Sequence, residues 1–179
     1  QTSPNKTLSN TGLLNTELVG SYSYFGKSNQ INISYDKINM DYGIPGSLEG
    51  HIDGVDIKMT KRTQKLNYHR DITSFGFKRI DVDQRFITYS HSEFENGNDQ
   101  SAVSLGQDIY FIQSILSSDH AKIGSSIKYR SYKAGGFYWT PDTEEFNISI
   151  FGLYERKVFN TLYQISARAE RLYIKPERS

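Results

Sequence analysis

The sequence predicts an all-β protein, an antiparallel meander of about eight strands that belong to a transmembrane β-barrel. Three observations support this prediction: apolar and polar residues alternate with period two, short and long connections alternate, and aromatic residues are abundant. The chain of 179 residues holds 13 Tyr and 10 Phe, while hydrophobic residues make up only 36% of it. An apolar share this low does not predict a large dry core.

The four strands expected in the first half cover residues 14–24, 31–35, 55–68 and 77–91. The first two alternate clearly, with Leu18 and Tyr22, for example, on the same side of the extended chain. The next two have the length and the β-forming residues of strands but lose the alternation partway. Val55 and Leu66 fall in opposite phases, which either a β-bulge or an incorrect strand assignment would explain.

The four strands expected in the second half cover residues 103–115, 123–130, 146–154 and 163–170. The last is the cleanest, because one side is apolar from Tyr163 to Ala169 and the other is polar from Gln164 to Glu170. In a barrel, the apolar set would face lipid and the polar set the lumen. The residues expected toward lipid are Ile123, Ile127, Ile148, Ile150, Tyr163, Ile165 and Ala167. Those expected toward the lumen are Lys122, Lys128, Gln164, Ser166, Arg168 and Glu170.

The connections between these strands are short and long in strict alternation. Short ones cover residues 25–29, 71–76, 117–120 and 158–160, and long ones cover residues 41–54, 93–101 and 133–143. Tight turns at one end and extended loops at the other are typical of outer-membrane barrels. A soluble meander, such as a lipocalin-like barrel or a sandwich with uneven loops, is the alternative.

Two further features favour the membrane interpretation. The polar faces are rich in long charged side chains, which suit a wet lumen, and aliphatic residues are too sparse to fill a small soluble barrel. Rings also gather at the strand ends, where aromatic girdles would lie, although cross-strand ring pairs are the alternative. These rings are Tyr22, Tyr24, Phe25, Tyr35, Tyr42, Phe75, Phe77, Tyr89, Phe94, Tyr129, Tyr132, Phe159 and Tyr173.

Composition argues against several other functions. With 21 basic and 20 acidic residues the net charge is +1, so no clustered basic excess points to nucleic acid. No apolar run reaches the length of a membrane helix, and the absence of cysteine excludes disulfides and thiolate sites. No nucleophile elbow, phosphate loop or metalloprotease motif occurs, so we do not expect an enzyme.

Four motifs, in order along the chain, resemble TonB-dependent outer-membrane receptors. Residues 41–46 read Asp-Tyr-Gly-Ile-Pro-Gly, and residues 89–93 read Tyr-Ser-His-Ser-Glu. The Ala-Gly-Gly-Phe run at 134–137 leads to Pro141, and residues 151–155 give a Phe-x-x-x-Glu pattern. The resemblance covers roughly residues 12 to 174. None of these motifs is specific alone, so the evidence lies in their order.

This resemblance implies a transport receptor in the bacterial outer membrane, which takes up a scarce metal ion or a siderophore-like chelate through a plugged barrel. The implied partners are the lipid bilayer, a plug domain, the rest of the barrel and a periplasmic TonB-type energy-coupling protein. Such receptors have 22 strands and usually end in an aromatic residue, whereas this sequence ends in Ser179. We therefore expect residues 1–179 to be an internal part of the barrel domain, without the plug. The alternative is a soluble β-barrel or β-sandwich binding module or a surface adhesin.

Two His-x-acid patterns are the candidate metal site. His51 precedes Asp53, with Glu49 nearby, and His91 precedes Glu93, with Glu95 close behind. Residues two apart in an extended chain point the same way, so each pair could offer an imidazole and a carboxylate to a transported zinc, copper or nickel ion or an iron chelate. Exposed loops also collect such residues without binding metal. We expect no resident cofactor, and we expect His69 and His120, at the opposite rim, to be ordinary surface residues.

Overall fold

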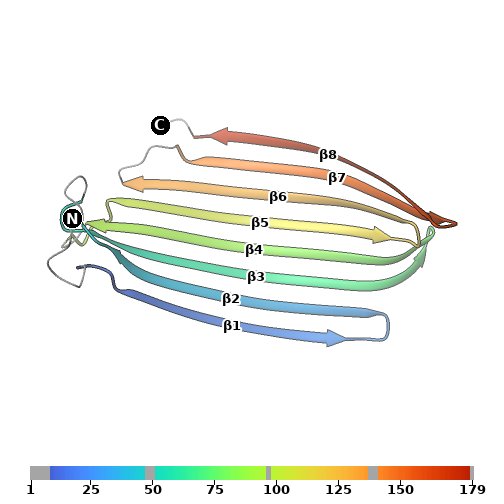
Figure 1. Cartoon of the computed structure of the whole chain (residues 1–179), viewed down its shortest axis with the longest axis horizontal. Coiled ribbons are helices and arrows are strands. Elements are labelled where there is room, and N and C mark those ends of the chain that lie inside the picture. The colour runs from blue at the N-terminus through green and yellow to red at the C-terminus, as the bar shows by residue number, and fades with distance from the viewer. Residues whose placement is uncertain (1–8, 47–50, 96–97, 137–140, 178–179) are drawn as a thin grey trace.

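The computed structural model of the chain describes residues 9–46, 51–95, 98–136 and 141–177. In these ranges the regular secondary structure is eight β-strands, which lie side by side in one sheet (Figure 1). They are β1 (Leu13–Phe25), β2 (Asn29–Ile44), β3 (Val55–Ser74), β4 (Phe77–Glu95), β5 (Val103–Ser117), β6 (Ala121–Gly136), β7 (Thr143–Val158) and β8 (Thr161–Pro176). None of the described residues belongs to a helix long and apolar enough to cross a membrane.

The strands pair in chain order from β1 to β8, and every pair is antiparallel. The predicted all-β class and the meander of eight strands are therefore confirmed. The short turns of the β1–β2, β3–β4, β5–β6 and β7–β8 hairpins lie together at one end of the sheet (Figure 1). Among the described residues no ladder joins β1 to β8, so the sheet is open.

An aromatic row crosses the sheet from β2 to β8. Its members are direct cross-strand partners and therefore share one face: Tyr35, Gln64, Phe86, Tyr110, Tyr129, Phe146 and Tyr173. The rings contact one another. Phe86 stacks on Tyr110 with 4.3 Å between the ring centroids, and the centroids of Tyr110 and Tyr129 lie 6.3 Å apart. The expectation of rings at strand ends is confirmed for Phe25, Phe75, Phe77, Phe94 and Phe159. It is wrong for this row, which lies within the strands, and for Tyr89, which lies on the opposite face.

The aromatic row separates an apolar zone from a polar one on its face, which we call the belt face. The next row toward the short turns is mostly apolar and consists of Tyr22, Ile33, Leu66, Gln84, Ile112, Ile127, Ile148 and Arg171. The next row toward the long connections is polar except for its first member and consists of Leu18, Lys37, Arg62, Thr88, Asp108, Ser131, Glu144 and Lys175. All seven residues expected toward lipid lie on the belt face. All six expected toward the lumen lie on the opposite face, which we call the network face.

The network face carries the reverse pattern, with its polar residues toward the short turns and its apolar residues toward the long connections. This reversal explains the change of phase in β3, where Val55 and Ile57 lie on the network face and Leu66 on the belt face. Neither a bulge nor an incorrect strand assignment is the explanation, because β3 is one strand whose register runs without a break from Val55 to Asp71. The only irregularity in that ladder falls between Asp71 and Ser74, next to the turn.

The ladders are also staggered across the sheet. Toward the short turns, the β1–β2 ladder ends at Phe25, five residues past Gly20, the partner of Tyr35. The β7–β8 ladder ends at Val158, twelve residues past Phe146 of the aromatic row. The opposite ends of the ladders shift in the same direction, so successive hairpins are displaced along the strands.

The sheet buries very little of itself. Val55 and Ile57 are the only buried hydrophobic residues among those described. The chain of 20.5 kDa exposes 13510 Å², whereas a compact soluble monomer of that mass exposes about 9,000 Å². Both faces therefore offer area that a surrounding medium or further protein would cover.

Candidate functional site

The network face holds a polar row that spans all eight strands. Its members are Ser23, Asn32, Asn67, Asp83, Gln113, Ser126, Ser149 and Glu170, each the direct partner of the next. Several bond to one another: Asn67 Nδ2 donates to Asp83 Oδ2 at 2.6 Å, and the Ser126 and Ser149 hydroxyls lie 2.7 Å apart. Ser149 is only 1% exposed, so this hydroxyl pair satisfies polar groups that water does not reach.

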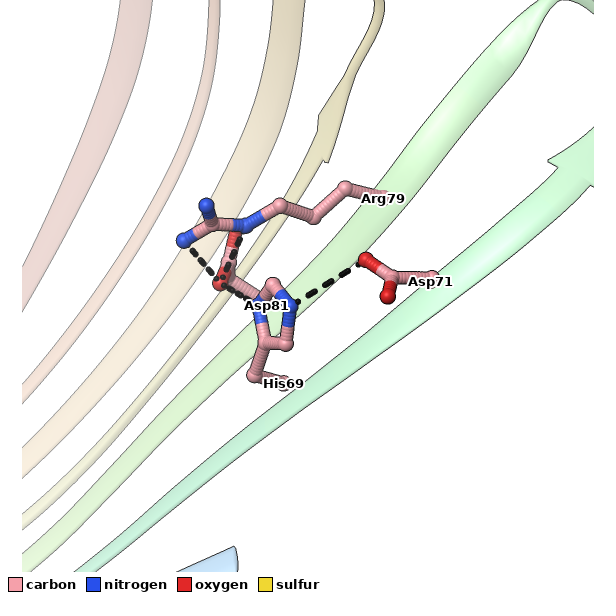
Figure 2. Close-up of polar contacts among 4 residues, drawn as sticks. All are labelled: His69, Asp71, Arg79 and Asp81. Atoms are coloured by element: carbon pink, nitrogen blue, oxygen red, sulfur yellow. Dashed lines mark hydrogen bonds and ion pairs between the residues drawn. The ribbon is translucent and has the colours of Figure 1, made fainter. Parts of the chain in front are cut away.

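Beside this row, four ionisable side chains of β3 and β4 form a cluster (Figure 2). His69 faces a carboxylate at each ring nitrogen, with Nδ1 3.0 Å from Asp81 Oδ1 and Nε2 3.3 Å from Asp71 Oδ1. Arg79 donates to both oxygens of Asp81 at 2.8 Å. The cluster borders a groove of about 370 Å³ whose other walls include Gln30, Asn32 and Gln113.

Sequence reasoning missed this cluster, because it treated His69 as an ordinary surface residue. The sequence did contain the signal. His69 and Asp71 form a third His-x-acid pattern, and Arg79, Asp81, Asp83 and Arg85 occupy alternate positions of one strand. The period of two places all of them on one face, and the β3–β4 hairpin brings the two sets together.

The other half of the network face holds an apolar patch. A groove of about 610 Å³ is lined there by Ile38, Met40, Met59, Ile87, Leu105 and Ile109. Tyr89 and Tyr132 add two rings to its walls, and Lys61 adds a charge. The deeply buried Ile57, 4% exposed, continues the patch toward the long connections.

The predicted metal residues lie beyond this patch, at the end of the long connections. His91 Nε2 lies 2.9 Å from Glu93 Oε1, so that pair does form. His51 Nδ1 lies 3.3 Å from Glu95 Oε1, and this contact links the β2–β3 connection to the end of β4. Glu49 lies outside the described residues, and Asp53 takes part in the local interactions at this end.

These contacts make two separate His–carboxylate pairs and not one ligand cage. Among the described residues, no three His, Asp or Glu side chains converge as a metal site. A mixed nitrogen and oxygen site between the two loops therefore stays a prediction.

Comparisons with known proteins give little further identification. No family model matches the chain, and no curated protein matches it. Among solved structures, the chain is similar to CdiB from Acinetobacter baumannii, with a TM-score of 0.45 and 15% sequence identity. The match covers 93% of this chain and 30% of that chain, so this chain spans less than a third of the length of CdiB.

The resemblance to TonB-dependent receptors is wrong. The family models and the curated proteins return no such receptor, and the solved structure reported above is CdiB. The motifs that suggested the family are short turn and strand patterns, which the meander itself accounts for. The plug domain and the energy-coupling protein were implied by that resemblance alone, and they lose their basis with it.

Proposed function

We propose that the chain forms part of the wall of a transport β-barrel in the bacterial outer membrane, with the belt face toward lipid and the network face toward a wet interior. The transported solute in this proposal is a metal ion or a small metal chelate. One observation carries the proposal: the two faces exchange polarity at the aromatic row. On the belt face, a sheet that crosses a bilayer and continues into water must change from apolar to polar in this way.

The belt face supports this proposal at the residue level. Its apolar zone is exposed, with Ile33 at 51% and Ile150 at 62%, although these side chains lie on strands inside the sheet. Rings next to lipid-facing aliphatic residues are typical of membrane interfaces. Beyond the rings every strand from β2 to β8 carries a polar residue, as expected where the surface leaves the hydrocarbon.

Strand length supports it as well. A β-strand tilted about 45° crosses a membrane with about 9 to 11 residues, and β3 and β4 have 20 and 19. About half of each strand would therefore extend into water at the end of the long connections. There the His51–Glu95 and His91–Glu93 pairs would meet the arriving solute first.

Site-directed labelling in lipid vesicles tests the orientation. The chain contains no cysteine, so a single introduced thiol reports one position cleanly. We expect Ile148→Cys to resist a membrane-impermeant maleimide in intact vesicles and to react after detergent is added. The adjacent Asn147→Cys, on the network face, is the matched control and should react in both conditions. Equal labelling of the two variants in vesicles would contradict the membrane orientation and favour the soluble binding module or adhesin.

Transport is tested separately in proteoliposomes of the native barrel assembly loaded with fluorescent metal indicators. We expect entry of zinc, copper or a ferric chelate above that of protein-free vesicles. Absence of entry for all of them, with correct labelling of Asn147→Cys, would keep the barrel wall and remove the metal cargo.

A further inference from the structure

The two methionines of the chain lie directly opposite each other, next to His91. Met40 on β2 pairs with Met59 on β3, and Met59 pairs with His91 on β4. The chain holds only these two methionines and no cysteine, so all of its sulfur lies at this one place. The three side chains share the network face, where Cβ atoms of opposite residues stand about 4.5–5.5 Å apart.

We propose that Met40, Met59 and His91 form a binding site for a soft monovalent metal ion, Cu(I) or Ag(I). Thioether sulfur is a soft ligand that prefers Cu(I) over hard cations, and imidazole also suits copper. Methionine side chains are flexible, so two of them on adjacent strands can turn their sulfur atoms toward one point. This site would specify which metal the barrel transports. Only that identification of the transported metal rests on the proposed function.

The contacts of His91 leave it available as a ligand. Its side chain is 14% exposed, and Nε2 bonds to Glu93 Oε1 at 2.9 Å. A carboxylate on one ring nitrogen is the usual way in which a metal-binding histidine is oriented. The other nitrogen, Nδ1, lies 3.4 Å from the Tyr89 hydroxyl, a long and weak contact that a metal ion can replace.

The surroundings also favour a soft ion over a hydrated one. The groove that contains both methionines is walled by the aliphatic side chains of Ile38, Ile87 and Leu105, and its side-chain oxygen atoms belong to neutral residues: Asn15, Tyr89, Gln107 and Tyr132. Lys61 also lines this groove, and the carboxylate beside the proposed site is Glu93, which bonds to His91. A dehydrated Cu(I) ion needs only two or three soft or nitrogen ligands, whereas Mg²⁺ and Ca²⁺ need six or more oxygen atoms.

Silver titration of the full chain, folded in detergent, tests the site without a redox step. We expect one Ag⁺ per chain by calorimetry, with affinity at least tenfold weaker in Met40→Leu and in Met59→Leu. Leucine keeps the volume and the apolar character of methionine, so these variants should remain folded. His91→Gln should weaken binding similarly, and His120→Gln, at the other end of the sheet, is the control that should bind as wild type does.

Unchanged Ag⁺ affinity in the Met40→Leu/Met59→Leu double variant would overturn the proposal. So would a site that binds Zn²⁺ more tightly than Ag⁺ and depends on His51 and His91 but not on the methionines. Both results are independent of the labelling of Ile148→Cys and Asn147→Cys, so failure of the metal site and failure of the barrel wall are distinguishable.

Discussion

At the scale of single residues, the sheet depends on small polar groups that satisfy one another. Ser126 and Ser149 are direct partners on β6 and β7, both buried, and their hydroxyls form one hydrogen bond. The pair therefore contributes little by itself but is costly to break on one side only.

This asymmetry gives the first prediction. Ser126→Ala should lower the free energy of unfolding by about 1–3 kcal/mol, because it leaves the Ser149 hydroxyl buried without its partner. The double variant Ser126→Ala/Ser149→Ala should recover part of that loss. Urea unfolding of Ser126→Ala, Ser149→Ala and the double variant measures these losses. A double variant that loses the sum of the two single losses would mean that the hydroxyls do not depend on each other.

A second residue-scale prediction concerns Gly124, whose partner Phe151 covers it. A Cβ at Gly124 would lie 2.3 Å from Phe151 Cζ, so Gly124→Ala must displace the ring. Overpacking of this kind costs about 1–3 kcal/mol. Gly152, next to Phe151 in sequence, meets nothing closer than 3.8 Å and serves as the control. Equal unfolding midpoints for Gly124→Ala and Gly152→Ala would show that the ring moves freely.

At the scale of strands, the sequence predicted well which strands exist and which residues share a face. It predicted poorly why the alternation of β3 changes phase. Alternation in β8 and β7 placed Ile165 and Ile148 on one face correctly, since a period of two needs no knowledge of neighbours. In β3 the alternation also persists, but the apolar set moves from one face to the other. A single strand cannot distinguish that reversal from a bulge, because the reversal becomes evident only when all eight strands are aligned.

The strand β8 offers a direct test of facing. Ile165 and Ser166 are neighbours on opposite faces. Ile165→Arg should destabilise the protein in a bilayer by about 2–4 kcal/mol if it lies near the membrane midplane, while Ser166→Arg should be mild because long polar side chains already occupy that face. Folding yields into vesicles at increasing urea give both values. If Ser166→Arg is the more harmful of the two, the assignment of faces is reversed.

The candidate site shows the same division between what sequence could and could not predict. The His91–Glu93 pair followed from spacing alone, as did the placement of both His-x-acid patterns at one end. The contact of His51 with Glu95, in place of a shared cage, depends on loop conformation that no period specifies. The row of Met40, Met59 and His91 depends on the register between three strands separated widely in sequence.

At the scale of the whole molecule, the open sheet exposes two complete strand edges, on β1 and β8. Unpaired backbone groups at such edges cannot stay in hydrocarbon, where no water satisfies them. In the proposed barrel, further strands would therefore pair with both edges. The long charged side chains of the network face, such as Arg85 and Arg168, favour a barrel wider than eight strands.

Cross-linking measures how the wall closes. We expect Ser21→Cys on β1 and Ser166→Cys on β8, combined in one chain, to give no cross-link within that chain with a bismaleimide of about 10 Å, because other strands separate the two edges. The pair Ser21→Cys and Ser34→Cys, direct partners on β1 and β2, is the positive control. An efficient cross-link between β1 and β8 of one molecule would mean that the eight strands close on themselves.

The stagger of the ladders determines how the strands would be inclined in the proposed membrane wall. From the β1–β2 ladder to the β7–β8 ladder, the ends of the ladders shift along the strands by about one residue per strand, measured from the aromatic row. One residue rises about 3.3 Å and one strand spacing is about 4.8 Å, which corresponds to an inclination of about 35° between the strands and the membrane normal. At that angle a level plane shifts by about one residue toward the short turns at each successive strand, so in the proposed orientation Leu18 on β1 would lie deeper in the hydrocarbon than Arg171 on β8. This inclination accounts for two exceptions to the polarity of their rows, Leu18 and Arg171, but not for the third, Gln84 on β4.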